Sequence, residues 1–328
     1  MRDLNALPKA NLHLHLTGSM RQETAAELAA RAGLELPAPL DGTQAVGWSA
    51  FQTRYDAARA ALRSADDIAR VVREAIADSA ADGAGWLELQ VDPTTYAEHL
   101  GGLEAVVETV LGAAAGTPTG IVVAASWGAS PTTAQRLARL AARYAGTGVV
   151  GFGLSNDERL GRVADFAPAF RVAAGAGLLA VPHAGFYQAA WHVRDCVRLL
   201  RATRIGHGLT AALDPGVLES MARRAVAVEV CPTSYPPLGV AELAALPIRE
   251  FLAAGIPVAL GSDDPLLFGA GLTDQYALLR EHLRSDDQEL AALARASIQV
   301  SAAPQEIKDA LLAGVEAWLT SEPTSSVG

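Results

Sequence analysis

The chain is poor in cysteine and almost free of lysine. Cys196 and Cys231 are the two cysteines among its 328 residues, and they lie far apart in the sequence. Two distant cysteines make no disulfide framework, and so few thiols suit a protein that folds in a reducing cytoplasm. Lysine occurs only at positions 9 and 308, so arginine carries nearly all of the positive charge.

Positive charge itself is in deficit. Acidic residues outnumber basic ones by 36 to 26, which gives a net charge of -10. A chain without a basic patch is a poor ligand for nucleic acid or for an anionic membrane, so we expect neither as a partner. No apolar run approaches the roughly 20 residues of a membrane span, and the N-terminus lacks a signal pattern. We expect a soluble, cytoplasmic protein that acts on a small molecule, and its oligomeric state stays open.

Hydrophobic residues make up 50% of the chain, enough for a large core. Short β-branched runs alternate with longer segments of helical period, which favours parallel strands joined by helices. No Gly-rich dinucleotide loop follows the first run, so we expect a closed (β/α)₈ TIM barrel of class α/β instead of an open doubly wound sheet. The eight expected strands are residues 10–16, 85–91, 120–126, 149–155, 177–183, 203–209, 225–231 and 256–262.

The segment between the first two strands is too long for one crossover. We expect residues 17–84 to form several helices that cover the pocket, because loops at the carboxyl ends of barrel strands build the active site. Residues 321–328 are polar and are expected to form a flexible tail. The whole of 1–328 is then a single barrel domain.

Histidines recur at the expected strand ends. In NLHLHL, His13 and His15 are two residues apart and share one strand face, while the leucines share the other. Imidazoles inside a barrel need a partner, and a metal ion is such a partner, although H-x-H alone also occurs in ordinary strands. His183, His207 and the pair Asp263 and Asp264 end three further strands.

Three imidazoles and one carboxylate suit zinc with a site left open for water. His13, His15, His183 and Asp263 form that set, with one Zn²⁺ expected per chain and Fe²⁺ or Mn²⁺ as alternatives. A zinc ion lowers the pKa of bound water to about 7. His207 is then left to orient or deprotonate the water, unless it is a core histidine.

Two further residues have a structural alternative. Asp264 precedes Pro265 and also fits the N-cap of a helix. Cys231 follows an apolar strand, where a buried thiol is favoured over a nucleophile because no base is assigned to it. The cysteine-ligated nucleobase deaminase signature is absent.

These residues resemble the adenosine deaminase family of metal-dependent amidohydrolases. The matching motifs are PKANLHLHLTGSMRQET, FGLSNDE, PHAG, RIGHG, EVCPTS and GSDDPLLFG, in the family's order and over most of the chain. The resemblance implies that His13, His15, His183 and Asp263 hold zinc, that His207 activates water, and that Asp264 hydrogen-bonds the substrate or the hydroxide.

The sequence departs from this family around the substrate. Where the family has H-A-G-E, whose glutamate protonates a purine ring nitrogen, this chain has Phe186. Gln90 and Trp127 stand where the family has arginines, and Asn156 where it has a glycine. Tyr187, Tyr235 or Glu229 is then a candidate to replace the lost acid. We therefore expect Asp264, Phe186, Tyr187, Asn156, Trp127 and Tyr235 to contact the substrate, and His207, Asp264 and Glu229 to act in catalysis.

The sequence thus predicts a zinc-dependent aminohydrolase that attacks a C–N bond of a heterocyclic or nucleoside-like substrate other than adenosine. Three alternatives stay open. One is an adenosine deaminase with a substituted general acid, and another is a metal hydrolase acting on a non-purine intermediate of specialised metabolism. The third is a binding protein that kept the barrel and lost its activity.

Overall fold

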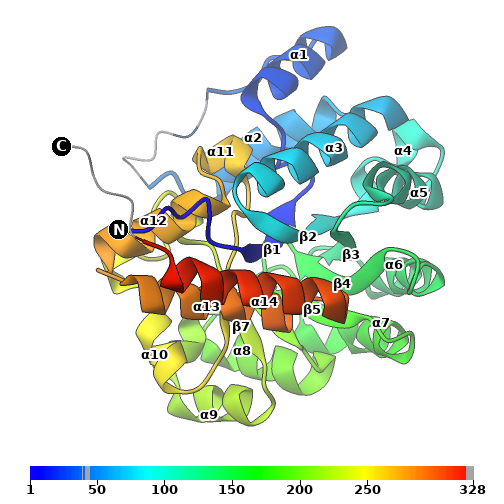
Figure 1. Cartoon of the computed structure of the whole chain (residues 1–328). Helices are drawn as coiled ribbons and strands as arrows, with labels where there is room; N and C mark the ends of the chain where they lie inside the picture. Colours follow the sequence, from blue (N-terminus) through cyan, green and yellow to red (C-terminus); the bar gives the residue numbers. More distant parts are fainter. Residues whose placement is uncertain (39, 41–44, 323–328) are drawn as a thin grey trace.

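A computed structural model describes residues 1–38, 40 and 45–322, and it has the predicted (β/α)₈ barrel (Figure 1). Eight parallel strands pair in chain order from β1 to β8. They are β1 (Lys9–His15), β2 (Ala84–Val91), β3 (Thr119–Ser126), β4 (Val149–Ser155), β5 (Leu179–Ala184), β6 (Arg204–His207), β7 (Ala227–Val230) and β8 (Val258–Leu260).

The last four strands are shorter than predicted or shifted by up to two residues. Their flanks take up left-handed backbone conformations, with φ of 67° at His207, 52° at Ala225 and 57° at Asp263. A residue with positive φ cannot continue a strand. Apolar character alone therefore overestimated the lengths of β6 and β7, and β8 is also shorter than predicted.

The barrel is completed through Asp263, just beyond β8. Its backbone N–H donates to the His13 carbonyl at 2.8 Å, and its own carbonyl accepts from the His15 N–H at 3.1 Å. This ladder joins the end of β8 to β1 and fixes the Asp263 carboxylate beside the two histidines.

Helices surround the barrel on the outside (Figure 1). Those that follow β2 to β8 are α4 (Ala97–Leu100), α5 (Leu103–Ala114), α6 (Pro131–Arg143), α7 (Val163–Gly175), α8 (Ala190–Asp195), α9 (Pro215–Arg223), α10 (Ile248–Ala253), α11 (Pro265–Phe268), α12 (Leu272–His282), α13 (Asp287–Val300) and α14 (Gln305–Thr320). Shorter 3₁₀ turns span Pro93–Thr95, Leu209–Leu213, Pro232–Ser234 and Leu243–Ala245, and a π-helical turn spans Cys196–Leu200.

The segment between β1 and β2 forms α1 (Gln22–Ala32), α2 (Gly47–Ala60) and α3 (Ala65–Ala81). Ser64 starts α3 with a capping box, in which its hydroxyl accepts from the Asp67 N–H. Figure 1 places these three helices together at one end of the barrel, close to α11. Phe51 of α2 stacks on Phe268 of α11 with ring centroids 5.6 Å apart, so the inserted segment is packed against the loop that follows β8.

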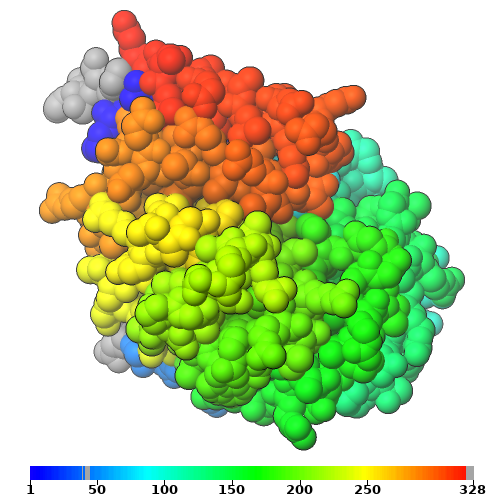
Figure 2. All heavy atoms as spheres, turned by 90° about the horizontal axis from the view of Figure 1, so that it is seen from below, coloured from blue at the N-terminus to red at the C-terminus, as the bar shows by residue number. Residues whose placement is uncertain are grey.

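The face opposite α1 is built mostly by the second half of the chain, shown from green through red in Figure 2. Within the described residues, no helix is long and apolar enough to cross a membrane. Of the predicted tail 321–328, residues 323–328 lie outside the part of the chain that the structure describes.

Candidate active site

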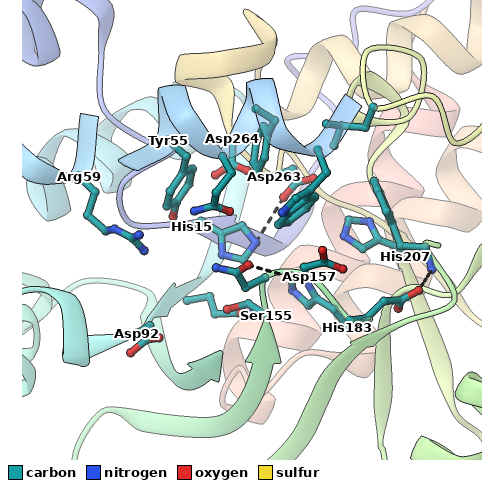
Figure 3. Close-up of a pocket in the computed structure, with 18 of the residues that line it drawn as sticks. His15, Tyr55, Arg59, Asp92, Ser155, Asp157, His183, His207, Asp263 and Asp264 are labelled. Carbon is teal, nitrogen blue, oxygen red and sulfur yellow. Dashed lines mark hydrogen bonds and ion pairs between the residues drawn. The ribbon is translucent and has the colours of Figure 1, made fainter. Parts of the chain in front are cut away.

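A pocket opens at the carboxyl ends of the strands, under the inserted helices (Figure 3). Its empty volume is about 870 Å³ including the open mouth. Strand ends contribute one part of its wall and α2 another. The lining residues are His15, Leu16, Trp48, Phe51, Gln52, Tyr55, Arg59, Gln90, Asp92, Thr95, Tyr96, Ser155, Asn156, Asp157, Glu158, His183, Phe186, Tyr187, His207, Leu238, Asp263 and Asp264.

The structure brings the four predicted metal ligands together. His15 Nε2 lies 3.3 Å and His13 Nε2 lies 3.5 Å from Oδ1 of Asp263. The His183 ring lies 4.5 Å from the His13 ring and 5.1 Å from the His15 ring between centroids. One ring nitrogen from each of these histidines lies within 4.8 Å of the other two. The donor atoms thus converge from β1, β5 and the loop after β8.

This donor set fits a divalent cation. His13 Nε2 and His183 Nε2 are buried and have no hydrogen-bond partner among the described residues. Ligands of a tetrahedral cation with bonds of about 2.0–2.1 Å are about 3.3 Å apart, close to the two histidine–Asp263 distances. Burial alone lowers the pKa of His13, but Asp263 and Glu229 outweigh it and raise that pKa to about 10. The carboxylates therefore favour positive charge at this point.

A buried ionic network supports the cluster from inside the barrel. His13 Nδ1 lies 2.9 Å from Glu229 Oε2, and the Arg204 Nε donates to Glu229 Oε1 at 2.5 Å. Arg204 also pairs with Glu88 on β2. Because Glu229 accepts from the Nδ1–H of His13, Nε2 is the nitrogen directed toward the other ligands, and it would bind a cation after losing its proton.

Glu229, one of three candidates to replace the lost acid, lies outside the pocket lining. Its side chain is fully buried beneath His13 and is absent from the pocket lining. Burial favours a neutral carboxyl, yet Arg204 and His13 keep the pKa of Glu229 below its ordinary value. A carboxylate with both oxygens engaged below the pocket has no proton to give a substrate.

Two glycines make room for the cluster. A Cβ on Gly206 in β6 would lie 2.5 Å from His183 Cδ2 and 2.9 Å from His13 Cε1. A Cβ on Gly18 would lie 1.7 Å from Asp264 Oδ1. Side chains at these positions would displace the imidazoles and the carboxylate, so the glycines are there for close packing.

His207 and Phe186 lie side by side next to the cluster, with ring centroids 4.5 Å apart. The His207 ring is also 4.9 Å from that of His13 and 5.0 Å from that of His183. Burial lowers the pKa of His207 to about 3. His207 thus faces the pocket as predicted, and the position of Phe186 presents an aromatic ring that donates no proton.

Asp264 lines the pocket beside His15 (Figure 3). It occupies the N-cap position of α11, but its side chain makes no capping hydrogen bond. Its Oδ1 is buried and has no hydrogen-bond partner among the described residues. Burial and the adjacent Asp263 raise the pKa of Asp264 well above its ordinary value. The structure therefore leaves this carboxyl free for a ligand.

Trp127 and Tyr235 do not reach the pocket, which contradicts their prediction as substrate contacts. Trp127 Nε1 donates to the carbonyl of His183 at 3.0 Å, behind that residue. The Tyr235 hydroxyl accepts from the Cys231 N–H at 2.8 Å and lies 3.4 Å from His207 Nδ1. Both side chains are fully buried, so they contact site residues from the side away from the pocket.

Tyr187 and Asn156 do line the pocket. The Tyr187 hydroxyl donates to the Leu238 carbonyl at 3.0 Å, which commits its proton to the protein. Asn156 has φ of 72°, a conformation in which glycine is common, and its Oδ1 accepts from the Asp157 N–H at 2.7 Å. Neither residue replaces the missing glutamate as a donor in this arrangement.

The loop that carries Phe186 is held by Glu158, the last residue of the FGLSNDE motif, which was not predicted as a site residue. Oε1 of Glu158 accepts the backbone N–H groups of residues 186, 187 and 188 at 2.5–3.0 Å. Its other oxygen lies 3.4 Å from Nδ1 of His192. His192 is fully buried in α8.

Other pocket residues were missed because they come from the inserted helices. Trp48, Phe51, Gln52, Tyr55 and Arg59 project from α2. Figure 3 shows Arg59 and Asp92 at the opposite end of the pocket from His207. Helical periodicity marks α2 as amphipathic, but it does not reveal which turn lies over the mouth.

Comparison with known proteins decides the family. The adenosine deaminase family model matches residues 8–318. The chain belongs to the adenosine deaminase family. It is 51% identical over 334 residues to a putative adenosine/adenine deaminase of Streptomyces virginiae, covering 97% of this chain and 98% of that protein.

Two other relatives carry different substrate names. An aminodeoxyfutalosine deaminase of Streptomyces coelicolor is 34% identical, with 98% of this chain and 88% of that protein covered. The crystal structure of an adenine deaminase from Arthrobacter aurescens superimposes with a TM-score of 0.88 at 30% identity, covering 96% of this chain and 99% of the other. Family membership makes this chain a hydrolase of the deaminase type, acting on C–N bonds.

Proposed function

We propose that this chain is a zinc-dependent aminohydrolase that removes an amino group from a heterocyclic or nucleoside-like substrate other than adenosine. The observation that carries the proposal is the convergence of His13, His15, His183 and Asp263 at the pocket floor, with buried ring nitrogens left unpaired. These four residues would hold the cation. When bound, it supplies an acidified water as nucleophile.

The reaction exchanges one bond for another. A C–O bond forms to the carbon that bears the amino group, the C–N bond breaks, and ammonia leaves with one proton of the consumed water while the other proton stays on the product. His207 takes a proton from the attacking water and passes it toward the leaving nitrogen. The Tyr235 hydroxyl, 3.4 Å from Nδ1, orients the His207 ring from behind. Asp264, with its free Oδ1, hydrogen-bonds the substrate or the attacking oxygen.

The pocket argues against adenosine as the substrate. Phe186 occupies the position of the family's ring-protonating glutamate, and its ring packs on His207. Loss of a general acid typically reduces a rate by a factor of about 10² to 10⁴. Beside Phe186, Tyr187 donates its hydroxyl proton to the Leu238 carbonyl, and the Tyr235 hydroxyl is buried 3.4 Å from His207 Nδ1, outside the pocket lining. A substrate whose carbon accepts water without ring protonation fits this site better.

Ammonia release from a panel of aminated purines, pterins and pyrimidines tests the proposal. The zinc-loaded protein is expected to release ammonia from at least one of them, and a chelator is expected to abolish the release. Zinc added back restores it. Release that is insensitive to chelation, or none from any compound with fully loaded protein, would contradict the proposal.

Matched histidine variants separate catalysis from folding. His207→Ala is expected to keep its bound zinc and lose ammonia release, because the ring that moves the proton is gone. His99→Ala, at an exposed position on α4, is the control and should match the wild type in both. Retained turnover in His207→Ala would remove that residue from the mechanism.

A further inference from the structure

Gln90 is a buried polar residue whose side-chain amide makes no hydrogen bond within the described part of the chain. It lies near the carboxyl end of β2, lines the pocket and is 2% exposed. Neither Nε2 nor Oε1 has a hydrogen-bond partner among the described residues. An amide that is buried without partners destabilises the fold. A side chain of this kind in a pocket wall therefore indicates a group that a ligand satisfies.

The amide lies next to the candidate metal centre. Gln90 is the register partner of His15 across β1 and β2, so both residues reach the mouth at the same level. On β4, a Cβ added to Gly153 would lie 3.6 Å from Gln90 Cδ, so the glycine leaves the space beside the amide without a side chain. A bound heterocycle that places its attacked carbon at the histidine cluster would therefore have the neighbouring edge of its ring beside Gln90.

The chemistry of an amide defines the edge that it recognises. Nε2 donates and Oε1 accepts, so one glutamine makes two parallel hydrogen bonds to a partner with an adjacent acceptor and donor. A ring nitrogen next to an exocyclic amino group is such an edge, and a lactam is another. The arginine that the family has at this position only donates. Glutamine therefore changes what the site selects.

We propose that Gln90 determines specificity by binding the donor–acceptor edge of an aminated heterocycle next to the carbon that is attacked. This inference rests on the proposed function and names the substrate class for it. The unpaired amide atoms, their burial and their place beside His15 carry it.

Binding of two small probes to the zinc-loaded protein tests the role of Gln90. 2-Aminopyrimidine has a ring nitrogen beside its amino group, whereas aniline has the amino group on a ring of carbon alone. Ligand-observed NMR titration is expected to show that the wild type binds 2-aminopyrimidine about ten- to a hundredfold more tightly. Gln90→Met is expected to remove that preference and to leave the affinity for aniline unchanged. Equal affinity of the wild type for both probes, or an undiminished preference in Gln90→Met, would overturn the inference.

Thermal unfolding distinguishes a recognition role from a structural one. Gln90→Met removes an unpaired buried amide, so the variant is expected to unfold at or above the wild-type temperature and to bind zinc normally. A lower unfolding temperature with loss of zinc would mean that Gln90 supports the fold, which contradicts the inference. Gln90→Glu, which keeps the shape and the acceptor but lacks the donor, is a second variant and should also lose the preference.

The experiments distinguish a wrong reaction from a wrong role for Gln90. If the probe preference depends on Gln90 but no aminated heterocycle releases ammonia, the proposed reaction is wrong and the recognition role of Gln90 stands. If ammonia is released by a zinc-dependent route while Gln90→Met keeps the wild-type preference, the reaction stands and the inference about Gln90 is wrong.

Discussion

Phe186 and His207 show how one residue affects the chemistry at the pocket floor. The His207 ring keeps its place beside His13 and His183, while the Phe186 ring covers its outer side at 4.5 Å. An aromatic ring excludes water and donates no proton to a purine. The proposed ligand cluster therefore matches the family's motifs, while position 186 departs from them.

Phe186→Glu tests this separation. A glutamate at this position restores an acid beside the attacked ring, so adenosine turnover is expected to rise by up to about 10²-fold over the wild type. Ammonia release from adenosine by zinc-loaded protein is the measurement. Phe186→Gln, which is polar but carries no acidic proton, is the matched control and should not show the rise.

The Phe186→Glu variant has a second possible outcome. If Phe186→Glu keeps its zinc but gains no adenosine turnover, the shape of the pocket excludes adenosine as well. In that case the loss of the acid would not explain the altered substrate.

The grouping of single residues was predictable where strand position alone decides it. His13, His15, His183 and Asp263 end strands of one barrel, and such ends meet at one mouth. A position near the end of a strand does not predict whether the side chain points into the pocket or behind it. For this reason the sequence did not predict that the pocket lining lacks Trp127, Tyr235 and Glu229. The alternation of Trp86, Glu88 and Gln90 with three apolar residues could have placed Gln90 on the inner face of β2.

Among the elements, β6 has a glycine, Gly206, at the point where it passes the histidine cluster. Gly206 pairs with His183 on β5 and Glu229 on β7, so it lies between the imidazole cluster and its supporting carboxylate. The close approach of His183 and His13 leaves no room there for a methyl group. The β6 backbone at Gly206 is therefore in close contact with the rings of His183 and His13.

Gly206→Ala is expected to weaken zinc binding by at least tenfold, because the added Cβ would lie 2.5 Å from the His183 ring and force it out of place. Equilibrium titration with zinc against a competing chelator measures the loss. Gly112→Ala, within α5 where nothing lies within 4 Å of the added Cβ, is the control. It should bind zinc normally and unfold about 1 kcal/mol less easily, since alanine favours a helix over glycine. Unchanged zinc affinity in Gly206→Ala would show that the cluster tolerates displacement.

The order of the elements was predictable, and their ends and contacts were less so. Alternating runs located all eight strands, but the left-handed residues at 207, 225 and 263 were invisible to an apolar pattern. The segment before β2 was recognised as helical from its length and period. The contact of Phe51 with Phe268, which sets α2 over the mouth, is tertiary and has no signal in the local sequence.

On the scale of the whole molecule, one of the few positive charges in the interior is a lysine at the start of the barrel. Lys9, one of two lysines, is fully buried at the start of β1, and its Nζ donates to the carbonyls of Leu4 at 2.8 Å and Leu7 at 3.0 Å. Burial is the main influence and lowers the pKa of Lys9 to about 8, against the opposing effects of Asp82 and Asp3. Folding therefore makes the charged form of Lys9 less favourable than it is in the unfolded chain.

This shift predicts a pH dependence of stability. Between pH 8 and about 10.5 the unfolded chain keeps a proton on Lys9 that the folded chain has lost, so the free energy of unfolding rises with pH through this window. Relative to Lys9→Met, the wild type is expected to gain on the order of 3 kcal/mol from pH 8 to 10.5 in denaturant titrations.

Lys308→Met, at a partly exposed position on α14, is the control for this comparison and should show a smaller change with pH. A difference between the wild type and Lys9→Met that stays constant from pH 8 to 10.5 would mean that Lys9 titrates normally in the folded protein.

The proposed metal centre depends on the whole barrel, because its four ligands come from β1, β5 and the loop beyond β8. Anomalous diffraction at the zinc edge, from crystals of the zinc-loaded protein, is the decisive measurement. We expect one strong peak within coordination distance of His13, His15, His183 and Asp263, at the floor of the pocket. Crystals of fully loaded protein with no peak at that point would contradict this expectation.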